Sequence, residues 1–207
     1  MKPIVLVDMD GVLADFDAAL WNVITEQEIP TNCTRETQRV RFLHDAVSKE
    51  DRPRIRAIVE ECGWFRNLPL IPGAREGLRA LEDLAEVWIC SKPLEPNRTC
   101  RDDKANWIEE HLGPRWVDRL ILAPDKSLVR GDILLDDAPK PSWYARASWT
   151  PVIFPTIWNG SDSKWAGLPC WSWGQDPLKL LSFAKGAAGK AAEMQLLNNN
   201  PFPFTYA

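Results

Sequence analysis

The sequence predicts an α/β protein in which a mostly parallel β-sheet is flanked by helices. Three observations favour this class: short aliphatic runs recur along the chain, helical stretches separate them, and polar residues follow the ends of several runs. The expected strands are Ile4 to Val7, Glu86 to Cys90, Leu120 to Leu122, Ile133 to Leu135 and Val152 to Phe154. Crossovers in such sheets are right-handed, so a Rossmann-like arrangement is expected.

The first aliphatic run leads directly into acidic residues. Ile4 to Val7 carries no charge, which is typical of a strand buried on both faces. Asp8 follows the run, and Gly11 permits a tight turn. A helix is then expected, with Asp15 as its N-cap and Pro30 beyond its end.

A long helical insertion is predicted after this first strand. The segment from Thr34 to Cys62 is highly charged and has a helical pattern, and Ser48 and Asp51 have capping-box spacing. Its apolar stripe consists of Ile55, Ile58, Val59 and Cys62. We expect residues 16–70 to form a small helical cap on an α/β core made of residues 1–15 and 71–183.

Two further helices are expected in the core. The first follows Gly73 and places Leu78, Leu81 and Leu84 on one face, and the second runs from Arg101 to Leu112. Residues 184–207 are rich in Ala, Asn and Pro, so we expect a tail that is disordered unless something docks it.

Composition limits the partners. The chain has 25 Lys and Arg against 29 Asp and Glu, a formal net charge of -4 and a pI of about 5.3, so binding to long nucleic acid is not expected. The N-terminal apolar run is interrupted by Asp8 and Asp10, unlike that of a signal peptide. No stretch is apolar for long enough to span a bilayer, so no membrane partner is expected.

The cysteines favour a reducing compartment. There are five, widely spaced and without a C-x-x-C pair, and the chain has only two histidines. This pattern disfavours a disulfide framework and a structural zinc site. Reduced thiols and a cytoplasmic location are expected.

Polar residues follow four of the expected strands. Asp8 and Asp10 follow the first, Ser91 ends the second, Lys126 comes after the third, and Asp136 and Asp137 end the fourth. Each alone is weak evidence, because such residues often cap a turn or face solvent. Ligands of parallel sheets bind at the carboxyl edge, where these residues should meet. A cluster of carboxylates there requires a cation, and oxygen ligands suit Mg²⁺.

With these motifs in order, the chain resembles the haloacid dehalogenase (HAD) superfamily of phosphotransferases, and within it the 5'(3')-deoxyribonucleotidases. The resemblance runs from about Ile4 to Asp137 and rests on V-D-M-D-G-V-L-A-D-F, L-I-P-G-A, W-I-C-S-K-P, K-A-N-W-I-E-E-H-L-G-P and D-K-S-L-V-R-G-D-I-L-L-D-D. It implies a Mg²⁺-dependent phosphatase that removes phosphate from a nucleoside monophosphate, with deoxyribose as the expected sugar. An aspartyl-phosphate intermediate is implied as well.

The resemblance assigns roles to the residues at the strand ends. Asp8 would be the nucleophile, and Asp10 the general acid and then the general base. Ser91, Lys126 and Lys104 would bind the phosphate. Magnesium would be held by Asp8, the Asp10 carbonyl and the acidic pair, either directly by Asp137 with Asp136 behind it or in the reverse order.

Some positions depart from the family or match it loosely. Phe16 falls where the family places an aromatic residue near the base, and Trp64 and Phe65 show a further likeness to base-contacting residues. Ser91-Lys92-Pro93 stands where the animal enzymes read Thr-Ser-Pro. Lys92 therefore either adds a second cation beside the phosphate or faces solvent.

Tryptophan is abundant, with eleven residues, and six of them crowd the region after the last acidic pair. Base stacking, an oligomer interface as in a homodimer, and packing of a C-terminal extension against the sheet all fit this pattern, and packing is favoured.

Other functions fit parts of the pattern. A sugar phosphate or a polynucleotide 3'-phosphate is an alternative substrate for the same chemistry. A non-catalytic receiver domain also holds a phosphoaspartate with acidic residues, Lys and Mg²⁺. A receiver carries its acidic pair on the first strand and its phosphoacceptor on a central one, so the motif order favours the enzyme.

Overall fold

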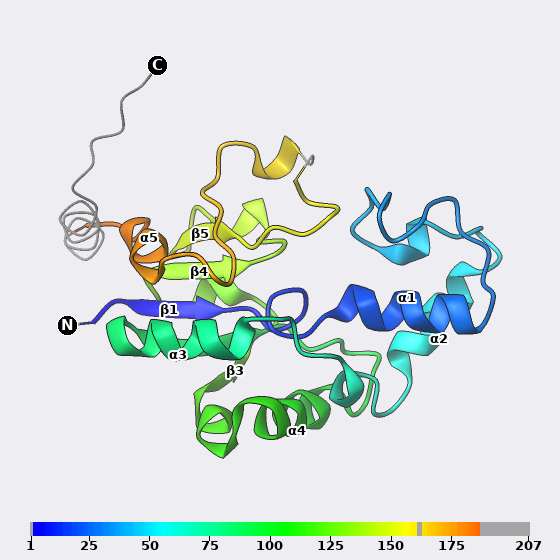
Figure 1. Ribbon diagram of the computed structural model, residues 1–207, viewed down its shortest axis with the longest axis horizontal. Helices are drawn as coiled ribbons and strands as arrows, with labels where there is room; N and C mark the ends of the chain where they lie inside the picture. Colours follow the sequence, from blue (N-terminus) through cyan, green and yellow to red (C-terminus); the bar gives the residue numbers. More distant parts are fainter. Residues whose placement is uncertain (1, 161–162, 187–207) are drawn as a thin grey trace.

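The computed structural model describes residues 2–160 and 163–186, and their arrangement is shown in Figure 1. The sheet consists of β1 (Ile4–Val7), β2 (Glu86–Ser91), β3 (Leu120–Leu122), β4 (Ile133–Asp136) and β5 (Thr150–Ile153). The strand order is β3-β2-β1-β4-β5, and every neighbouring pair is parallel. The predicted parallel sheet is confirmed, and all five carboxyl ends lie at one edge.

The two faces of the sheet bury different side chains of β1. Val5 and Val7 pack into the main hydrophobic core with helices α3 (Ala74–Leu84), α4 (Cys100–Leu112) and α5 (Pro177–Ser182). Leu6 points to the opposite face, where Trp143 and Trp149 cover it. Since β1 is enclosed on both sides, its carboxyl end is the place where the chain can turn polar side chains toward a ligand.

A second hydrophobic cluster forms beyond the carboxyl edge of the sheet. It contains α1 (Phe16–Glu26) and α2 (Arg52–Glu60), packed through Leu20, Ile24, Ile55 and Ile58. Asp15 caps α1 as expected, because its carboxylate accepts a hydrogen bond from the Ala18 amide at 2.9 Å. Figure 1 shows α1 and α2 together on the side toward which β1 points.

The expected helical character of residues 34–48 is wrong. Turns and bends, with one 3-10 helix at Leu43–Asp45, fill the stretch before α2. The Thr34 amide donates to the Thr37 hydroxyl at 2.8 Å, and the Gln38 side-chain amide donates to the Val40 carbonyl at 2.9 Å. Such local bonds satisfy the backbone in non-helical geometry and compete with a helix.

The tryptophan-rich segment packs mainly against the core, as favoured. Trp171 is buried in the main cluster, and the Trp173 indole donates to the Val12 carbonyl at 2.7 Å. Trp173 lies so close to Gly77 that a side chain there would overlap its ring. Short 3-10 helices complete the chain at Phe65–Asn67, Pro114–Arg119, Lys126–Leu128, Pro141–Trp143 and Ser163–Trp165.

The predicted tail begins just after α5, and its residues 187–207 lie outside the described part of the chain. All five cysteines have free thiols. Within residues 2–160 and 163–186, none of the helices combines the length and apolar character that a bilayer span requires.

Candidate active site

Asp8 is fixed at the carboxyl end of β1. Its amide donates to the Leu135 carbonyl at 2.8 Å, so its backbone continues the pairing between β1 and β4. The Met9 amide donates to Asp8 Oδ1 at 2.7 Å and orients the carboxylate. The acidic residue is therefore held by the same ladder that forms the sheet.

Lys126 joins two of the strand ends. It begins a 3-10 helix after β3 whose N-cap is Asp125, which accepts from the Ser127 amide at 3.0 Å. Its Nζ lies 2.7 Å from Asp8 Oδ1 and 2.7 Å from Asp136 Oδ2. The Lys126 side chain is 2% exposed, so its ammonium group compensates two carboxylates away from bulk water.

Lys104 makes a second buried link. Its Nζ lies 2.6 Å from Asp10 Oδ2 and 3.0 Å from the Ser91 hydroxyl, and Phe65 covers it at 4.7 Å from the ring centroid. The other oxygen of Asp10, Oδ1, is buried, and it has no hydrogen-bond partner among the residues that the structure describes. Lys104 thus fixes one side of Asp10 and leaves an acceptor on the other side unsatisfied.

Asp137 projects from the end of β4 toward the turn after β1. Gly11 has a φ of 78°, and a side chain at this position would overlap the Asp137 carboxylate. Oxygens of Asp8, Asp136 and Asp137 all lie within 4.8 Å of one another. Asp136 uses its second oxygen to accept from the Ala138 amide at 2.7 Å, whereas none of the described residues donates to the Asp137 carboxylate.

Burial and like charge shift these acids strongly. Burial raises the pKa of Asp8 to about 7; the Asp136 and Asp10 carboxylates act in the same direction and Lys126 opposes them. Burial, followed by the charges of Asp136 and Asp8, raises the pKa of Asp137 well above its ordinary value. Two neighbouring carboxylates with raised pKa values, together with the Asp136 carboxylate beside them, indicate a site that a divalent cation would stabilise.

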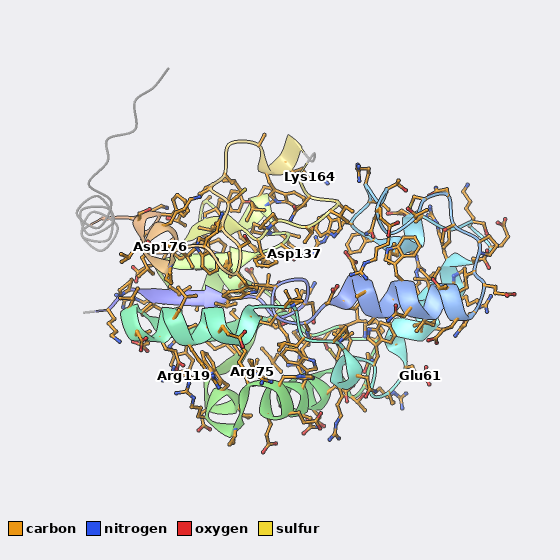
Figure 2. The ribbon with its side chains drawn as sticks, in the orientation of Figure 1. Glu61, Arg75, Arg119, Asp137, Lys164 and Asp176 are labelled. Atoms are coloured by element: carbon orange, nitrogen blue, oxygen red, sulfur yellow. The ribbon has the colours of Figure 1, made fainter. Side chains whose placement is uncertain are left out.

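A cavity of about 510 Å³ opens over this cluster. Its floor includes Asp8, Asp10 and Asp137 from the sheet edge, and its upper wall comes from α1, α2 and the loop between them. Figure 2 shows Asp137 at the edge of the sheet that faces α1. The volume is in the range of small-molecule sites.

The predicted site residues fall into two layers. Those that line the cavity are Asp8, Asp10, Asp137, Ser91, Lys92, Phe16 and Phe65. Lys104, Lys126 and Asp136 are buried behind the lining, where they contact lining carboxylates. Trp64 also lies outside the lining and packs edge-on against Phe16, with ring centroids 5.9 Å apart.

The cavity also contains residues that the sequence analysis did not single out. Asp17, Arg41, Lys140 and Trp158 line it. The Trp158 indole donates to Asp17 at 2.9 Å, and burial raises the pKa of Asp17 to about 6. Asp17 could have been found from its place beside Phe16 at the start of the helix, but nothing in the local sequence marks Arg41 or Lys140.

The parallel sheet, with acidic residues at its strand ends, has the haloacid dehalogenase-like fold. A haloacid dehalogenase-like family hydrolase from Streptococcus pneumoniae shares this fold, with a TM-score of 0.51 at 12% sequence identity over 88% of this chain and 90% of that one.

The chain belongs to the family of 5' nucleotidase, deoxy (Pyrimidine), cytosolic type C proteins, whose sequence model matches residues 2–154. It is 37% identical over 162 residues to the human 5'(3')-deoxyribonucleotidase, cytosolic type, covering 75% of this chain and 81% of that protein. It is 30% identical to the human mitochondrial 5'(3')-deoxyribonucleotidase, covering 75% of this chain and 71% of that protein.

Family membership confirms the predicted enzyme class, a nucleotidase hydrolase. The receiver-domain alternative is therefore set aside. Trp158 lies beyond the segment that the family model matches, so part of the cavity wall comes from a region outside the shared sequence.

Proposed function

We propose that this protein is a Mg²⁺-dependent phosphomonoesterase that dephosphorylates deoxyribonucleoside monophosphates through an aspartyl phosphate on Asp8. The observation that carries the proposal is the meeting of Asp8, Asp10 and Asp137 on the floor of one cavity, with Lys126 bound behind Asp8. The deoxyribonucleotidase names of the relatives support the substrate class.

The residues present fit a magnesium ion. The donor set is made of carboxylate oxygens that lie within 4.8 Å of one another, which is the chemistry that Mg²⁺ prefers. The ion would be held by Asp8, Asp137 and the Asp10 carbonyl. Both oxygens of Asp136 already accept hydrogen bonds, one from Lys126 and one from the Ala138 amide, so Asp136 would hold Lys126 in place instead. When bound, the ion would offset the charge of the carboxylates and of the phosphate.

In the first step, an Asp8 carboxylate oxygen attacks phosphorus and the bond from phosphorus to the nucleoside oxygen breaks. Oδ1 of Asp8 is occupied by Lys126 and the Met9 amide, so Oδ2 is the attacking atom. The Lys126 ammonium opposes the effect of burial on the Asp8 pKa, and so favours the ionised carboxylate that the nucleophile requires.

Asp10 exchanges the proton. Its Oδ1, which has no hydrogen-bond partner, would donate a proton to the departing nucleoside oxygen and later take one from the water that attacks the phosphoaspartate. Lys104 holds the other oxygen of Asp10 at 2.6 Å and so orients the carboxylate.

The apolar part of the cavity suits a nucleobase. Phe16 and Phe65 face it, and Leu20, Ile55 and Val59 extend the apolar wall. Aromatic and aliphatic walls with a few polar groups are typical of small-molecule sites. The family description further supports a pyrimidine base. We propose that residues 16–70 act as the cap that encloses this end of the substrate.

The free thiols and the cytosolic type of one relative support a cytoplasmic location. A homodimer stays a prediction.

A panel of monophosphates, assayed with and without EDTA, tests the function. We expect phosphate release from deoxyribonucleoside monophosphates, loss with EDTA and recovery with excess Mg²⁺. Asp8→Asn should abolish turnover, whereas Asp118→Asn, at an exposed position outside the cavity, should not change it. Activity confined to sugar phosphates or polynucleotide 3'-ends would contradict the substrate assignment. Full activity of Asp8→Asn would contradict the mechanism.

A further inference from the structure

A second cavity of about 410 Å³ adjoins the active-site cavity. It lies between the loop before α2, which contributes residues 39–42 and 45, and the segments that follow β4 and β5. Arg41, Phe42 and Lys140 line both cavities, so the two spaces share a wall. Figure 2 shows Lys164 on the segment after β5, which supplies the far side of this second cavity.

The lining of the second cavity is strongly basic. It contains four cationic residues and a single acidic one: Arg39, Arg41, Lys140, Lys164 and Asp45. The Asp45 carboxylate also lies 3.4 Å from Arg52, which shares its charge. The lining therefore carries a clear excess of positive charge.

Three of these cations lack a carboxylate partner within residues 2–160 and 163–186. Arg39 donates to the Gln38 carbonyl at 2.8 Å, and the Arg41 guanidinium stacks over Phe42 at 4.9 Å from the ring centroid. The Lys140 ammonium lies 5.2 Å from the Trp143 ring centroid. These contacts orient the cations without neutralising them.

The shared wall also concentrates like charge. Lys92 lines the active-site cavity next to Ser91, and partial burial, then the charges of Lys92 and Arg41, lower the pKa of Lys140. Asp125 is the acid that acts in the opposite direction, and it is paired with Arg146. Positive groups forced together in this way are stabilised by a bound anion.

We propose that the second cavity is a second phosphate subsite, which holds the additional phosphate of a deoxyribonucleoside bisphosphate while the other phosphate is hydrolysed at Asp8. The phosphate at Asp8 already has Lys126 and Lys104 behind it, so the basic wall is surplus to hydrolysis of a monophosphate. The second cavity lies directly beside the active-site cavity, because Arg41, Phe42 and Lys140 line both, so a second phosphate on the same nucleotide would meet cations that border both spaces. The proposal rests on the proposed function and extends its substrate class.

The test compares kcat/KM for a deoxyribonucleoside 3',5'-bisphosphate and the matching 5'-monophosphate in the full chain. We expect a preference for the bisphosphate of about tenfold, or about 1.4 kcal/mol. Lys140→Ala should lower kcat/KM for the bisphosphate about fivefold more than for the monophosphate, mainly through KM, and so reduce the preference to about twofold. Lys49→Ala removes an exposed lysine outside both cavities and should change neither substrate.

Two results would overturn the subsite while leaving the phosphatase function intact. The first is an equal kcat/KM for the two substrates in the unaltered enzyme. The second is an equal fall in kcat/KM for both substrates in Lys140→Ala, which would indicate general attraction of anions. Absence of monophosphate turnover in the unaltered enzyme would instead refute the proposed function.

Calorimetry in the Asp8→Asn background measures binding without turnover. The bisphosphate should bind more tightly than the monophosphate, and adding Lys140→Ala should remove the difference; equal affinities would contradict the proposal. Inorganic phosphate tests the other source of the anion. If it changes monophosphate turnover in a way that Lys140→Ala abolishes, the cavity binds free phosphate and the bisphosphate assignment is wrong.

Discussion

Lys126 should stabilise the fold as well as the site, and Lys126→Met tests this directly. Methionine keeps much of the length and apolar character of the lysine stem but removes its charge. The substitution leaves the Asp8 and Asp136 carboxylates, each 2.7 Å from Nζ in the intact protein, without their shared cation. Both are buried, with side chains 12% and 4% exposed, so water replaces the lost contact poorly.

The size of the effect follows from this burial. Removing one partner of a buried ion pair costs about 3–5 kcal/mol. Because Lys126 serves two carboxylates, we expect the upper part of that range in the metal-free protein. For a chain of this length, 5 kcal/mol corresponds to a fall in Tm of roughly 10–20 °C. The loss should shrink as the pH falls, because burial raises the pKa of Asp8 and its protonation removes the unpaired charge.

Urea unfolding with EDTA, at pH 8 and pH 5, measures this effect. Lys126→Met should lose several times more free energy of unfolding at pH 8 than at pH 5, and Mg²⁺ should restore part of the loss at pH 8. Lys49→Met, at an exposed lysine, is the control and should change little at either pH. A Lys126→Met loss below about 1 kcal/mol, or an equal loss at both pH values, would refute the reasoning, since that is the size expected of a surface ion pair.

Three further predictions follow from single contacts. Gly11→Ala should lower both Mg²⁺ affinity and kcat, because its methyl group would displace the Asp137 carboxylate. It should also cost about 1–2 kcal/mol of stability, because φ is positive at this position. Gly174→Ala, at another positive φ and with no atom of the described residues within 4 Å, is the matched control for calorimetry and assay. Lys104→Met should reduce kcat by roughly 10²-fold, since Asp10 and Ser91 lose their common partner; a loss below threefold in a steady-state assay would contradict this. Burial raises the pKa of Asp17 from its ordinary value of 3.8 to about 6, so ionised Asp17 destabilises the fold above pH 6 and has no such effect below pH 3.8. Asp17→Asn should therefore raise the unfolding free energy by about 1 kcal/mol at pH 8 and change it little at pH 4. Equal effects at both pH values in urea titrations would count against this prediction.

The strands and the acidic strand ends could be predicted because short-range pattern determines them. An uncharged run such as Ile4 to Val7 has few alternatives to a buried parallel strand, and residues that follow such strands must meet at one edge. The layering behind Asp8 and Asp10 was not predicted. Lys104 and Lys126 were expected to bind the phosphate, and that stays a prediction. Their complete burial was not expected, because how deeply a long side chain is buried depends on tertiary packing rather than on local sequence.

The segment between β1 and α2 was harder to predict for the same reason. Its charged sequence favoured helix from residue 34 onward, yet side chains such as Thr37 bind nearby backbone groups and keep the segment irregular. Arg41 and Lys140 reach the cavity from this loop and from the segment after β4, which lie about a hundred residues apart. Only the folded arrangement brings them together, so the basic wall had no signature in the sequence.

The most direct test of the central claim is to trap the phosphorylated enzyme. Substrate labelled with ³²P in its phosphate is mixed with excess enzyme, quenched with acid within milliseconds and digested. Label should appear transiently on the peptide that contains Asp8, should be released by hydroxylamine, and should be absent from Asp8→Asn. Turnover at the normal rate without label on that peptide, or with label on another residue, would contradict the account.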